Sequence, residues 1–537
     1  MKSSLKRFNI FLIFLLPALI TGGLLIFAGN VSDGLRLVFL SLPGVIFLIL
    51  AVQQRKLYWY LFSVIWWLIF WFDSLLRSST WWLFDSDNEA YFIVEAIANT
   101  HPKEALSFFE LHAIWITLLL FALIALTIFY HVSVFKYLKS RHLADLWQSH
   151  FYKSSIILLI VLSLTSYIAK PSRKVHPLAF WTSYQTKIQD FKDRIKQHKH
   201  VHEQWDINAK QNLILTDQAK SKQTHVLVLS ESLTSLNLGV CGYPRNTTPE
   251  LAKRLGQLKV FCNAYSPSPS TLNALRVLLT ESSASDYKNY STESMLAYTK
   301  AAGYKIYWLS NQDDSYLASL FGSYADQAVY KNNRSGRSSS SLDENLLPDY
   351  QVALADPSPK KLIILHLIGV HPNYQERYPA AFNKFSSESN DIVETKLKQN
   401  NIDPWVRSLR NHYDNAVLYE DSLFAQFLDR LQANHFADFR SFTIVSDHGN
   451  EVGHEIDYAG HSPNTRAGYQ VPVIMWYDQM HEAGVNHSKA INTAQLDDNL
   501  LNIMGLKQKT AQPRSYWFDA DYHFKPEANW PYWKNKS

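Results

Sequence analysis

Apolar side chains gather in the first 170 residues of this 537-residue chain, and this uneven distribution constrains the fold more than any other feature. Each apolar run there is close to the ~20 residues that cross the hydrocarbon core of a bilayer as a helix. The runs are Ile10–Phe27, Leu35–Val52, Leu57–Leu76, Ala113–Val134 and Ser154–Ile168. The sequence therefore predicts a five-helix transmembrane domain over residues 1–170.

Basic residues set the orientation of these predicted helices. Lys6 and Arg7 precede the first run, Arg55 and Lys56 lie between the second and the third, and a further basic group lies between the fourth and the fifth. Loops rich in Lys and Arg stay on the cytoplasmic side of a membrane. We therefore expect an uncleaved, multi-pass chain whose loop 77–112 and whose residues after the fifth run lie outside the cytoplasm.

The pattern of residues 171–223 predicts a connecting segment that differs from the apolar runs before it. Trp181, Tyr184 and Ile188 recur at spacings of three and four, whereas Lys and Arg residues fall largely on the other face. This pattern indicates a basic amphipathic helix at the outer membrane–water boundary. A linker helix packed on the domain that follows is the alternative.

The C-terminal residues 224–537 have the pattern of an α/β domain. Apolar strands alternate with helical or irregular stretches, which favours a largely parallel sheet covered on both faces. One helix is clear between Asn411 and Leu431, where apolar residues follow the helical period. The expected strands are Val226–Leu229, Tyr304–Leu309, Leu362–Leu367, Phe442–Val445 and Val471–Trp476.

The net charge and the two cysteines limit which partners the chain can bind and how its cysteines are used. The net charge of +5 is small and scattered, so we expect no nucleic-acid partner. The chain has two cysteines, Cys241 and Cys262. Outside the cytoplasm a disulfide is permitted, and it is the favoured use of such a pair. Two free thiols are the alternative.

Side chains with metal-binding chemistry follow the expected strands. Asp447 and His448 come directly after one strand, and Glu231 comes directly after another. Ligand sites gather at the carboxyl ends of strands in open α/β sheets, and zinc favours such oxygen and nitrogen donors. His371 and His461 lie in loops just beyond strands. The sequence therefore predicts a zinc site here, with an ordinary polar turn after Val445 as the alternative.

A metal held by Glu, Asp and His still needs a fourth donor. For group transfer, a hydroxyl nucleophile on the metal is the economical choice, because coordination lowers its pKa and orients it. Thr271 follows a proline-rich turn and opens a predicted helix, whose N-terminus would also favour a bound phosphate. A helix cap is the more ordinary role of a threonine at such a position.

The segment SESLTSLNLGVCGYPRNTTPEL, residues 230–251, resembles the phosphoethanolamine transferases of Gram-negative bacteria, which are membrane members of the alkaline phosphatase and sulfatase superfamily. The strand-end S-D-H-G, the later G-H-S-P-N-T-R at residues 460–466 and the stretch at residues 368–379 are also similar to this family. The likeness covers nearly the whole chain. The residues that match closely in the first segment are Gly242, Tyr243, Pro244, Arg245, Thr247 and Pro249.

The resemblance implies roles for the candidate residues. By it, Thr271 is the nucleophile. The implied ligands of one zinc ion are Glu231, Thr271, Asp447 and His448. His371 and His461 are implied to bind the substrate or a second zinc ion. Between the third and fourth apolar runs, Thr100 and Glu104 resemble a segment implicated in binding the donor.

The resemblance also implies the reaction and its place. Phosphoethanolamine would pass from phosphatidylethanolamine to a cell-envelope acceptor through a phospho-threonine intermediate. The acceptor would be the lipopolysaccharide core or lipid A, and T-L-N-A-L from Thr271 onward is more similar to the branch that modifies core heptose or other saccharides. The enzyme would be an inner-membrane monomer with an alkaline phosphatase/sulfatase-like catalytic domain in the periplasm.

Three departures from the family pattern accompany these matches. Members that modify lipid A carry several disulfides, whereas this chain has two cysteines that are placed differently. Ala96 stands where an Asn is expected, and a Lys found in some members near Tyr316 is absent.

Other functions remain as alternatives. A phosphoglycerol transferase of the lipoteichoic acid synthase type also has five spans and a metal-bound Thr, but the G-Y-P-R run and the segment around Thr100 and Glu104 favour the first choice. A sulfatase-like hydrolase needs a Cys or Ser followed by x-P-x-R, a context that neither Cys241 nor Cys262 has. A membrane scaffold without enzymatic activity would have no reason to place Glu, Asp and His at separate strand ends.

Overall fold

The computed structural model describes residues 2–54, 56–84, 102–139, 150–285, 291, 293–312, 315–332, 341–388, 391–509, 515–527 and 530. The chain divides into two compact units. One comprises residues 1–94 and 109–190, and the other comprises residues 95–108 and 191–537. The domain boundaries expected at residues 170 and 223 stay a prediction.

The N-terminal unit is helical. Two of its helical stretches, Val31–Ala51 and Leu57–Trp81, are long and apolar enough to cross a membrane. Among the described residues, three shorter apolar helices cover Phe14–Phe27, Leu120–Val134 and Lys153–Ile168. The expectation of five spans therefore stays a prediction. The helices are α1 (Lys2–Phe27), α2 (Val31–Ser41), α3 (Pro43–Gln54), α4 (Leu57–Phe84), α6 (Pro102–Lys139), α8 (His150–Ile168) and α9 (Lys170–Val175).

The structure changes two of the expected boundaries in this unit. The run expected as one span from Leu35 to Val52 forms α2 and α3, and α3 begins at Pro43. Proline has no N–H to donate within a helix, so it stands at a first helical position and marks a break. The expected loop 77–112 is helical at both ends, because α4 continues to Phe84 and α6 begins at Pro102.

The predicted connecting helix is present and longer than expected. It is α10 (Pro177–Asn212). At its start, Trp181 Nε1 donates to Asp73 Oδ1 of α4 over 2.9 Å. Near its end, Trp205 and Ala209 are buried in the core of the α/β domain. The second half therefore packs as a linker helix would, whereas the position at a membrane boundary stays a prediction.

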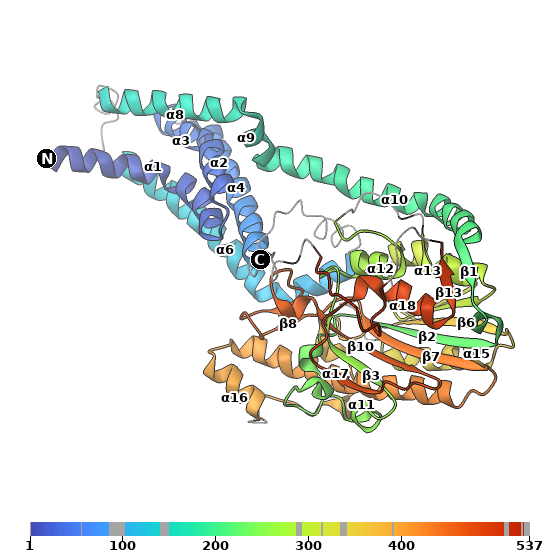
Figure 1. The fold of residues 1–537 in the computed structure, drawn as a ribbon. Helices are drawn as coiled ribbons and strands as arrows, with labels where there is room; N and C mark the ends of the chain where they lie inside the picture. Colours follow the sequence, from blue (N-terminus) through green and yellow to red (C-terminus); the bar gives the residue numbers. More distant parts are fainter. Residues whose placement is uncertain are drawn as a thin grey trace. The chain divides into compact units, whose positions relative to one another are not determined.

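The C-terminal unit is built on a nine-stranded sheet in the order β11-β3-β10-β7-β2-β6-β4-β5, with β12 also beside β3 (Figure 1). Its strands are β2 (Gln223–Ser230), β3 (Lys259–Tyr265), β4 (Lys305–Ser310), β5 (Gln327–Tyr330), β6 (Lys360–His366), β7 (Phe439–Ser446), β10 (Gln470–Tyr477), β11 (Gly484–Asn486) and β12 (Ile491–Asn492). The α/β class and all five expected strands are confirmed.

One strand runs against the expected direction. β7, β2, β6, β4 and β5 are parallel to one another, but β10 is antiparallel to both β7 and β3. A parallel neighbour needs a crossover connection, usually a helix. Residues 447–469, which join β7 to β10, hold only the short strands β8 (Glu451–Val452) and β9 (Ala459–Gly460) and one 3-10 turn, so the chain turns straight back.

Helices cover both faces of the sheet, as its apolar strands predict. Alternate residues of β2 enter two cores: Val226 and Val228 face one, and Leu227 and Leu229 face the other. Figure 1 shows α12, α13 and α18 on one side of the sheet and α11 and α17 on the other. The covering helices are α11 (Pro249–Lys253), α12 (Thr271–Leu279), α13 (Met295–Ala301), α15 (Leu347–Ala355), α17 (Pro404–Gln432) and α18 (Leu496–Ile503).

Candidate metal centre

Three adjacent parallel strands bring the predicted ligands to one edge of the sheet. Glu231 directly follows β2, Asp447 and His448 directly follow β7, and the loop after β6 carries His371. Glu231 and Asp447 are each 1% exposed, and His448 is fully buried. Because β2 lies between β7 and β6, these side chains converge, as the strand-end argument predicts.

Thr271 faces this cluster from the first turn of α12. Its Oγ1 donates to Glu231 Oε2 over 3.0 Å and lies 3.3 Å from His448 Nε2. His448 Nε2 in turn lies 3.3 Å from Glu231 Oε1 and 3.4 Å from Asp447 Oδ2. The cap position of α12 is held by Ser270, so the alternative of Thr271 as the helix cap is wrong.

The donor atoms of this cluster fit a zinc ion. Glu231, Asp447 and His448 each offer one ligand atom, and these atoms lie within 4.8 Å of one another. His448 Nδ1 lies 2.9 Å from the carbonyl oxygen of Gly449, which holds a proton on Nδ1, so Nε2, beside the carboxylates, is the nitrogen that would ligate a metal. Asp447 Oδ2 is buried and makes no hydrogen bond within the described part of the chain. Two carboxylates, an imidazole and a hydroxyl are a donor set that suits zinc.

The electrostatics of the cluster also favour a cation. Burial and the neighbouring Glu231 charge raise the pKa of Asp447 to about 8. Burial alone would lower the pKa of His448, but Asp447 and Glu231 raise it to about 9. Burial would likewise raise the pKa of Glu231, but the hydrogen bond and charge of His448 hold it well below its usual range. Two buried carboxylates in contact are costly without a compensating positive charge.

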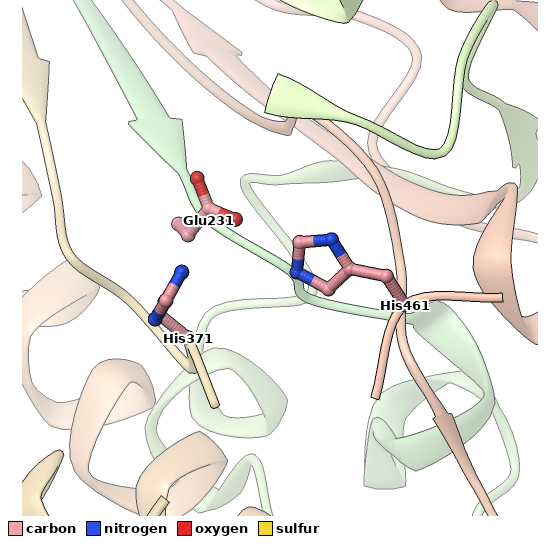
Figure 2. Close-up of side chains that lie close together, drawn as sticks. All are labelled: Glu231, His371 and His461. Atoms are coloured by element: carbon pink, nitrogen blue, oxygen red, sulfur yellow. The ribbon is translucent and has the colours of Figure 1, made fainter. Parts of the chain in front are cut away.

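Glu231 is shared with a second group of donors. Ligand atoms of Glu231, His371 and His461 also lie within 4.8 Å of one another. Figure 2 shows both imidazoles next to the Glu231 carboxylate. The ring centroids of His448 and His461 are 4.4 Å apart, so the two groups adjoin.

Two polar residues at the cluster were not predicted. Gln312 Nε2 donates to Glu231 Oε2 over 3.2 Å. Gln312 closely follows β4. It could have been predicted from the sequence in the same way as Glu231, since both follow the end of an apolar strand. Ser232 Oγ donates to Glu231 Oε1 over 2.8 Å, and its backbone N–H donates to Asp447 Oδ1 over 3.0 Å. Ser232 therefore ties the two carboxylates together.

A buried carboxylate supports the loop behind Glu231. Asp343 accepts hydrogen bonds from the backbone N–H groups of Ile368 and Gly369, each over 2.9 Å. Gly369 has φ +54°, and a Cβ there would lie 2.7 Å from both the backbone N and O of Glu231. The loop that leads to His371 can therefore pass close to Glu231 only with glycine at residue 369. Nothing in the sequence pattern marks Asp343.

His454 lies close to Asp447 and His448 in the sequence, whereas the predicted Thr100 and Glu104 come from a distant part of the chain. His454, which follows Asp447 and His448 in the sequence, bonds Asn237 Oδ1 through Nε2 over 2.7 Å and belongs to neither donor group. Thr100 lies outside the described residues. The structure describes Glu104 only as a backbone position of α6.

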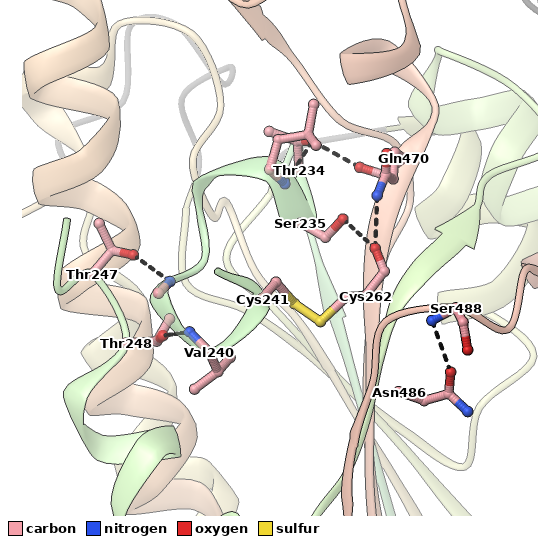
Figure 3. Close-up of a disulfide and its surroundings, with 12 residues drawn as sticks. Thr234, Ser235, Val240, Cys241, Thr247, Thr248, Cys262, Gln470, Asn486 and Ser488 are labelled. Atoms are coloured by element: carbon pink, nitrogen blue, oxygen red, sulfur yellow. Dashed lines mark hydrogen bonds between the residues drawn. A yellow bond between two sulfur atoms is a disulfide. The ribbon is translucent and has the colours of Figure 1, made fainter. Parts of the chain in front are cut away.

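The expected disulfide is present. Cys241 and Cys262 are bonded, with 5.5 Å between their Cα atoms (Figure 3). The bond joins the short 3-10 turn after β2 to strand β3. It therefore ties the loop that follows Glu231 to the strand that leads towards Thr271.

Comparisons with known proteins agree with the fold. The sulfatase family model matches residues 223–506. Phosphoethanolamine transferase EptC of Escherichia coli strain K12 is 31% identical over 342 residues, which cover 59% of this chain and 57% of that protein. The chain thus spans little more than half the length of this curated relative in the match.

Two solved structures are also similar. The C-terminal periplasmic domain of EptC from Escherichia coli in complex with Zn is 28% identical, with coverage of 56% of this chain and 87% of that chain and a TM-score of 0.49. The integral membrane protein lipooligosaccharide phosphoethanolamine transferase A from Neisseria meningitidis is 19% identical, with coverage of 92% and 95% and a TM-score of 0.53. The second likeness shows that the fold is shared over most of the chain.

Proposed function

Because this chain belongs to the sulfatase family, whose model matches more than half of it, we propose that it transfers phosphoethanolamine from phosphatidylethanolamine to a glycan of the cell envelope. The observation that carries the proposal is the Thr271 hydroxyl, which lies at a helix start against Glu231 and His448. The similar proteins named phosphoethanolamine transferases support the choice of the transferred group. We propose the lipopolysaccharide core or lipid A as acceptor.

In this proposal one zinc ion binds the first donor group. Its ligands are Glu231, Thr271, Asp447 and His448. Bound there, zinc would lower the pKa of the Thr271 hydroxyl and offset negative charge on the phosphoryl group. The position of His448 Nε2 beside both carboxylates and the buried Asp447 Oδ2 support this assignment.

The chain's own residues then carry out two displacements. Thr271 Oγ1 attacks the phosphorus of phosphatidylethanolamine, the bond from phosphorus to the diacylglycerol oxygen breaks, and the proton lost by Thr271 is balanced by the one that diacylglycerol gains. A hydroxyl of the acceptor then attacks the same phosphorus, the bond from phosphorus to Thr271 Oγ1 breaks, and the proton lost by the acceptor is balanced by the one that Thr271 regains. His371 and His461, across Glu231, would donate N–H groups to the phosphoryl oxygens as charge develops there.

We also propose how the chain lies in the cell. The N-terminal unit would span the inner membrane five times and hold the C-terminal unit, as a monomer, in the periplasm. Two long apolar helices and three shorter ones support this arrangement. So does the shared fold with an integral membrane protein over 92% of the chain. Thr100 and Glu104 would bind the ammonium group of the donor, on the resemblance of their segment.

Release of diacylglycerol by the purified full-length protein tests the proposal. We expect release from phosphatidylethanolamine and none from phosphatidylglycerol, and Thr271→Ala should abolish it. Release from phosphatidylglycerol alone would replace the proposal with a phosphoglycerol transferase. Hydrolysis of a sulfate ester with neither lipid cleaved would indicate a hydrolase.

A further inference from the structure

A cavity of about 310 Å³ lies beside the disulfide of the C-terminal unit. The loop after β2 forms one wall with Ser235 and Tyr243. Another wall consists of Arg466, from the loop before β10, and Gln470, the first residue of β10, and His487 contributes from the chain beyond β11. Neither donor group of the candidate metal centre lines it, and no function described above uses it.

The walls of this cavity continue from the loops that carry the metal-binding side chains. Thr234, three residues after Glu231, donates through Oγ1 to the carbonyl oxygen of Gln470 over 2.8 Å. The backbone N–H of Gly449, next to His448, donates to the carbonyl oxygen of Gly468 over 3.0 Å. Since β10 is antiparallel, its first residues lie at the same sheet edge as the carboxyl ends of β2 and β7. The cavity therefore belongs to the edge of the sheet that holds the candidate active site.

Gln470 presents an unmet hydrogen-bond acceptor in this wall. The residue is 4% exposed, and its Nε2 donates to the carbonyl oxygen of Cys262 over 2.7 Å, as Figure 3 shows. Its Oε1 is buried and has no hydrogen-bond partner among the described residues. Buried amide oxygens are almost always satisfied, so this atom calls for a donor that enters the cavity.

Arg466 presents unmet positive charge in the same wall. Its Nε is buried without a hydrogen-bond partner in the described chain, and its guanidinium forms no ion pair with a described residue. Glu455 Oε1 accepts a hydrogen bond from the backbone N–H of Arg466 over 2.6 Å, and this bond does not involve the arginine side chain. A guanidinium in this state matches a phosphate or carboxylate through two parallel hydrogen bonds.

The rest of the lining fits a sugar that carries a negative charge. His487 adds an imidazole to the lining, and the lining residues include no Asp or Glu. Asp414 accepts from the Tyr243 hydroxyl over 2.6 Å, which fixes that ring in the wall. Tyr243 and Leu236 provide apolar surface for a sugar ring, whereas Gln470 Oε1 can accept from a sugar hydroxyl.

We propose that this cavity is an acceptor subsite that binds a phosphorylated sugar of the envelope glycan. Arg466 binds the phosphate, and Gln470 accepts a hydrogen bond from a hydroxyl of the same sugar. The proposal rests on the proposed function and adds the chemical class that the acceptor must have. It assigns to Arg466 a role in the second displacement and none in the first.

Full-length Arg466→Gln tests this assignment, with Arg430→Gln as the matched control. Arg430 is a partly exposed arginine on α17, outside the cavity, which donates a long hydrogen bond to Gln351. The acceptors are lipopolysaccharide core oligosaccharide and the same oligosaccharide stripped of phosphate with hydrofluoric acid. For the phosphorylated acceptor, Arg466→Gln should raise KM by about ten-fold with kcat unchanged, since a charge-assisted pair is lost. Arg466→Lys, which keeps the charge but not the two-pronged contact, should give a smaller increase.

The controls separate the possible outcomes. Release of diacylglycerol from phosphatidylethanolamine without acceptor should be equal in wild type, Arg466→Gln and Arg430→Gln. With the stripped acceptor, wild type and Arg466→Gln should have the same KM. An unchanged KM for the phosphorylated acceptor, an equal loss with the stripped one, or a fall in diacylglycerol release would each overturn the subsite. Absence of diacylglycerol release by the wild type would instead overturn the proposed function.

Discussion

Glu231 and Asp447 are two buried carboxylates that contact one imidazole, an arrangement that costs stability unless a cation binds there. Burial and the charge of Glu231 raise the pKa of Asp447, whereas burial would lower the pKa of His448 and the charges of Asp447 and Glu231 raise it. A single divalent ion relieves the repulsion and satisfies the buried Asp447 Oδ2. At the scale of the residue, a bound metal would therefore serve the fold as well as the chemistry.

Removal of one ligand should accordingly remove the metal. We expect Asp447→Ala and His448→Ala to lower bound zinc and to reduce transfer by more than about 100-fold, because even changes in the groups around a metal's ligands cost up to that much. Zinc per protein, measured by plasma mass spectrometry, checks this. His454→Gln is the control, since His454 lies near by in sequence but outside both donor groups. Full zinc content and activity in Asp447→Ala would contradict the assignment.

A substitution at Gly369 tests whether the close approach of its loop to Glu231 positions that carboxylate. Gly369→Ala should destabilise the protein by about 2 kcal/mol or more, because its Cβ would meet the Glu231 backbone at 2.7 Å and its φ is +54°. Displacement of Glu231 should also lower bound zinc. Gly303→Ala is the matched control: its φ is +86° but nothing lies within 4 Å of a Cβ there. Equal thermal stability and zinc content of the two variants would show that the close approach does not position Glu231.

Single residues show how far the sequence predicts the site. Glu231, Asp447 and His448 could be selected because each directly follows an apolar strand, and the structure brings them into contact. Gln312 obeys the same rule but an amide is a weaker signal than a carboxylate. Asp343 could not be found, since its role depends on the backbone of residues 368 and 369, which only the folded chain brings to it.

At the scale of the element, hydrophobic pattern predicted which segments are strands better than how they pair. All five expected strands exist because their apolar runs are buried on both faces. The direction of β10 depends on the connection after β7, which has no helix, and an apolar run carries no information about direction. β3 was missed because Lys259 and Asn263 interrupt its apolar pattern.

The buried position of His225 in β2 predicts how the stability of the folded protein changes at acidic pH. Burial lowers the pKa of His225 from 6.5 to about 3, and its ring nitrogens contact Ser441 Oγ and Gln223 Oε1. Between those two values the unfolded chain binds a proton that the folded chain does not, so stability falls as the pH decreases below 6.5. The loss should reach about 2 kcal/mol near pH 5.

The melting temperature of full-length protein at about pH 7.5 and about pH 5 checks this prediction. His225→Gln should have a smaller decrease than wild type, because Gln has no proton to gain. His435→Gln, at an exposed position, should behave as wild type does. An equal decrease in all three proteins would show that His225 does not set the acid sensitivity.

At the scale of the whole molecule, the proposed function connects a lipid donor, bound at Glu104 of α6, to the chemistry of the C-terminal unit. Glu104→Gln tests this connection. If Glu104 binds the ethanolamine ammonium, transfer from phosphatidylethanolamine should fall about ten-fold for the loss of one charge-assisted contact. Cleavage of a small soluble phosphodiester by the same full-length variant should not change. If Glu104 only stabilises the start of its helix, its loss costs at most about 1 kcal/mol locally, and near-normal transfer would refute donor binding.

The central claim is that Thr271 carries the phosphoethanolamine group between donor and acceptor. Peptide mass spectrometry of full-length protein incubated with phosphatidylethanolamine, without acceptor, measures this directly. We predict a phosphoethanolamine adduct on Thr271 that disappears when acceptor is added, and no adduct on the folded Thr271→Ala variant. Turnover by Thr271→Ala, or an adduct on another residue such as Ser268 or Ser270, would contradict the account.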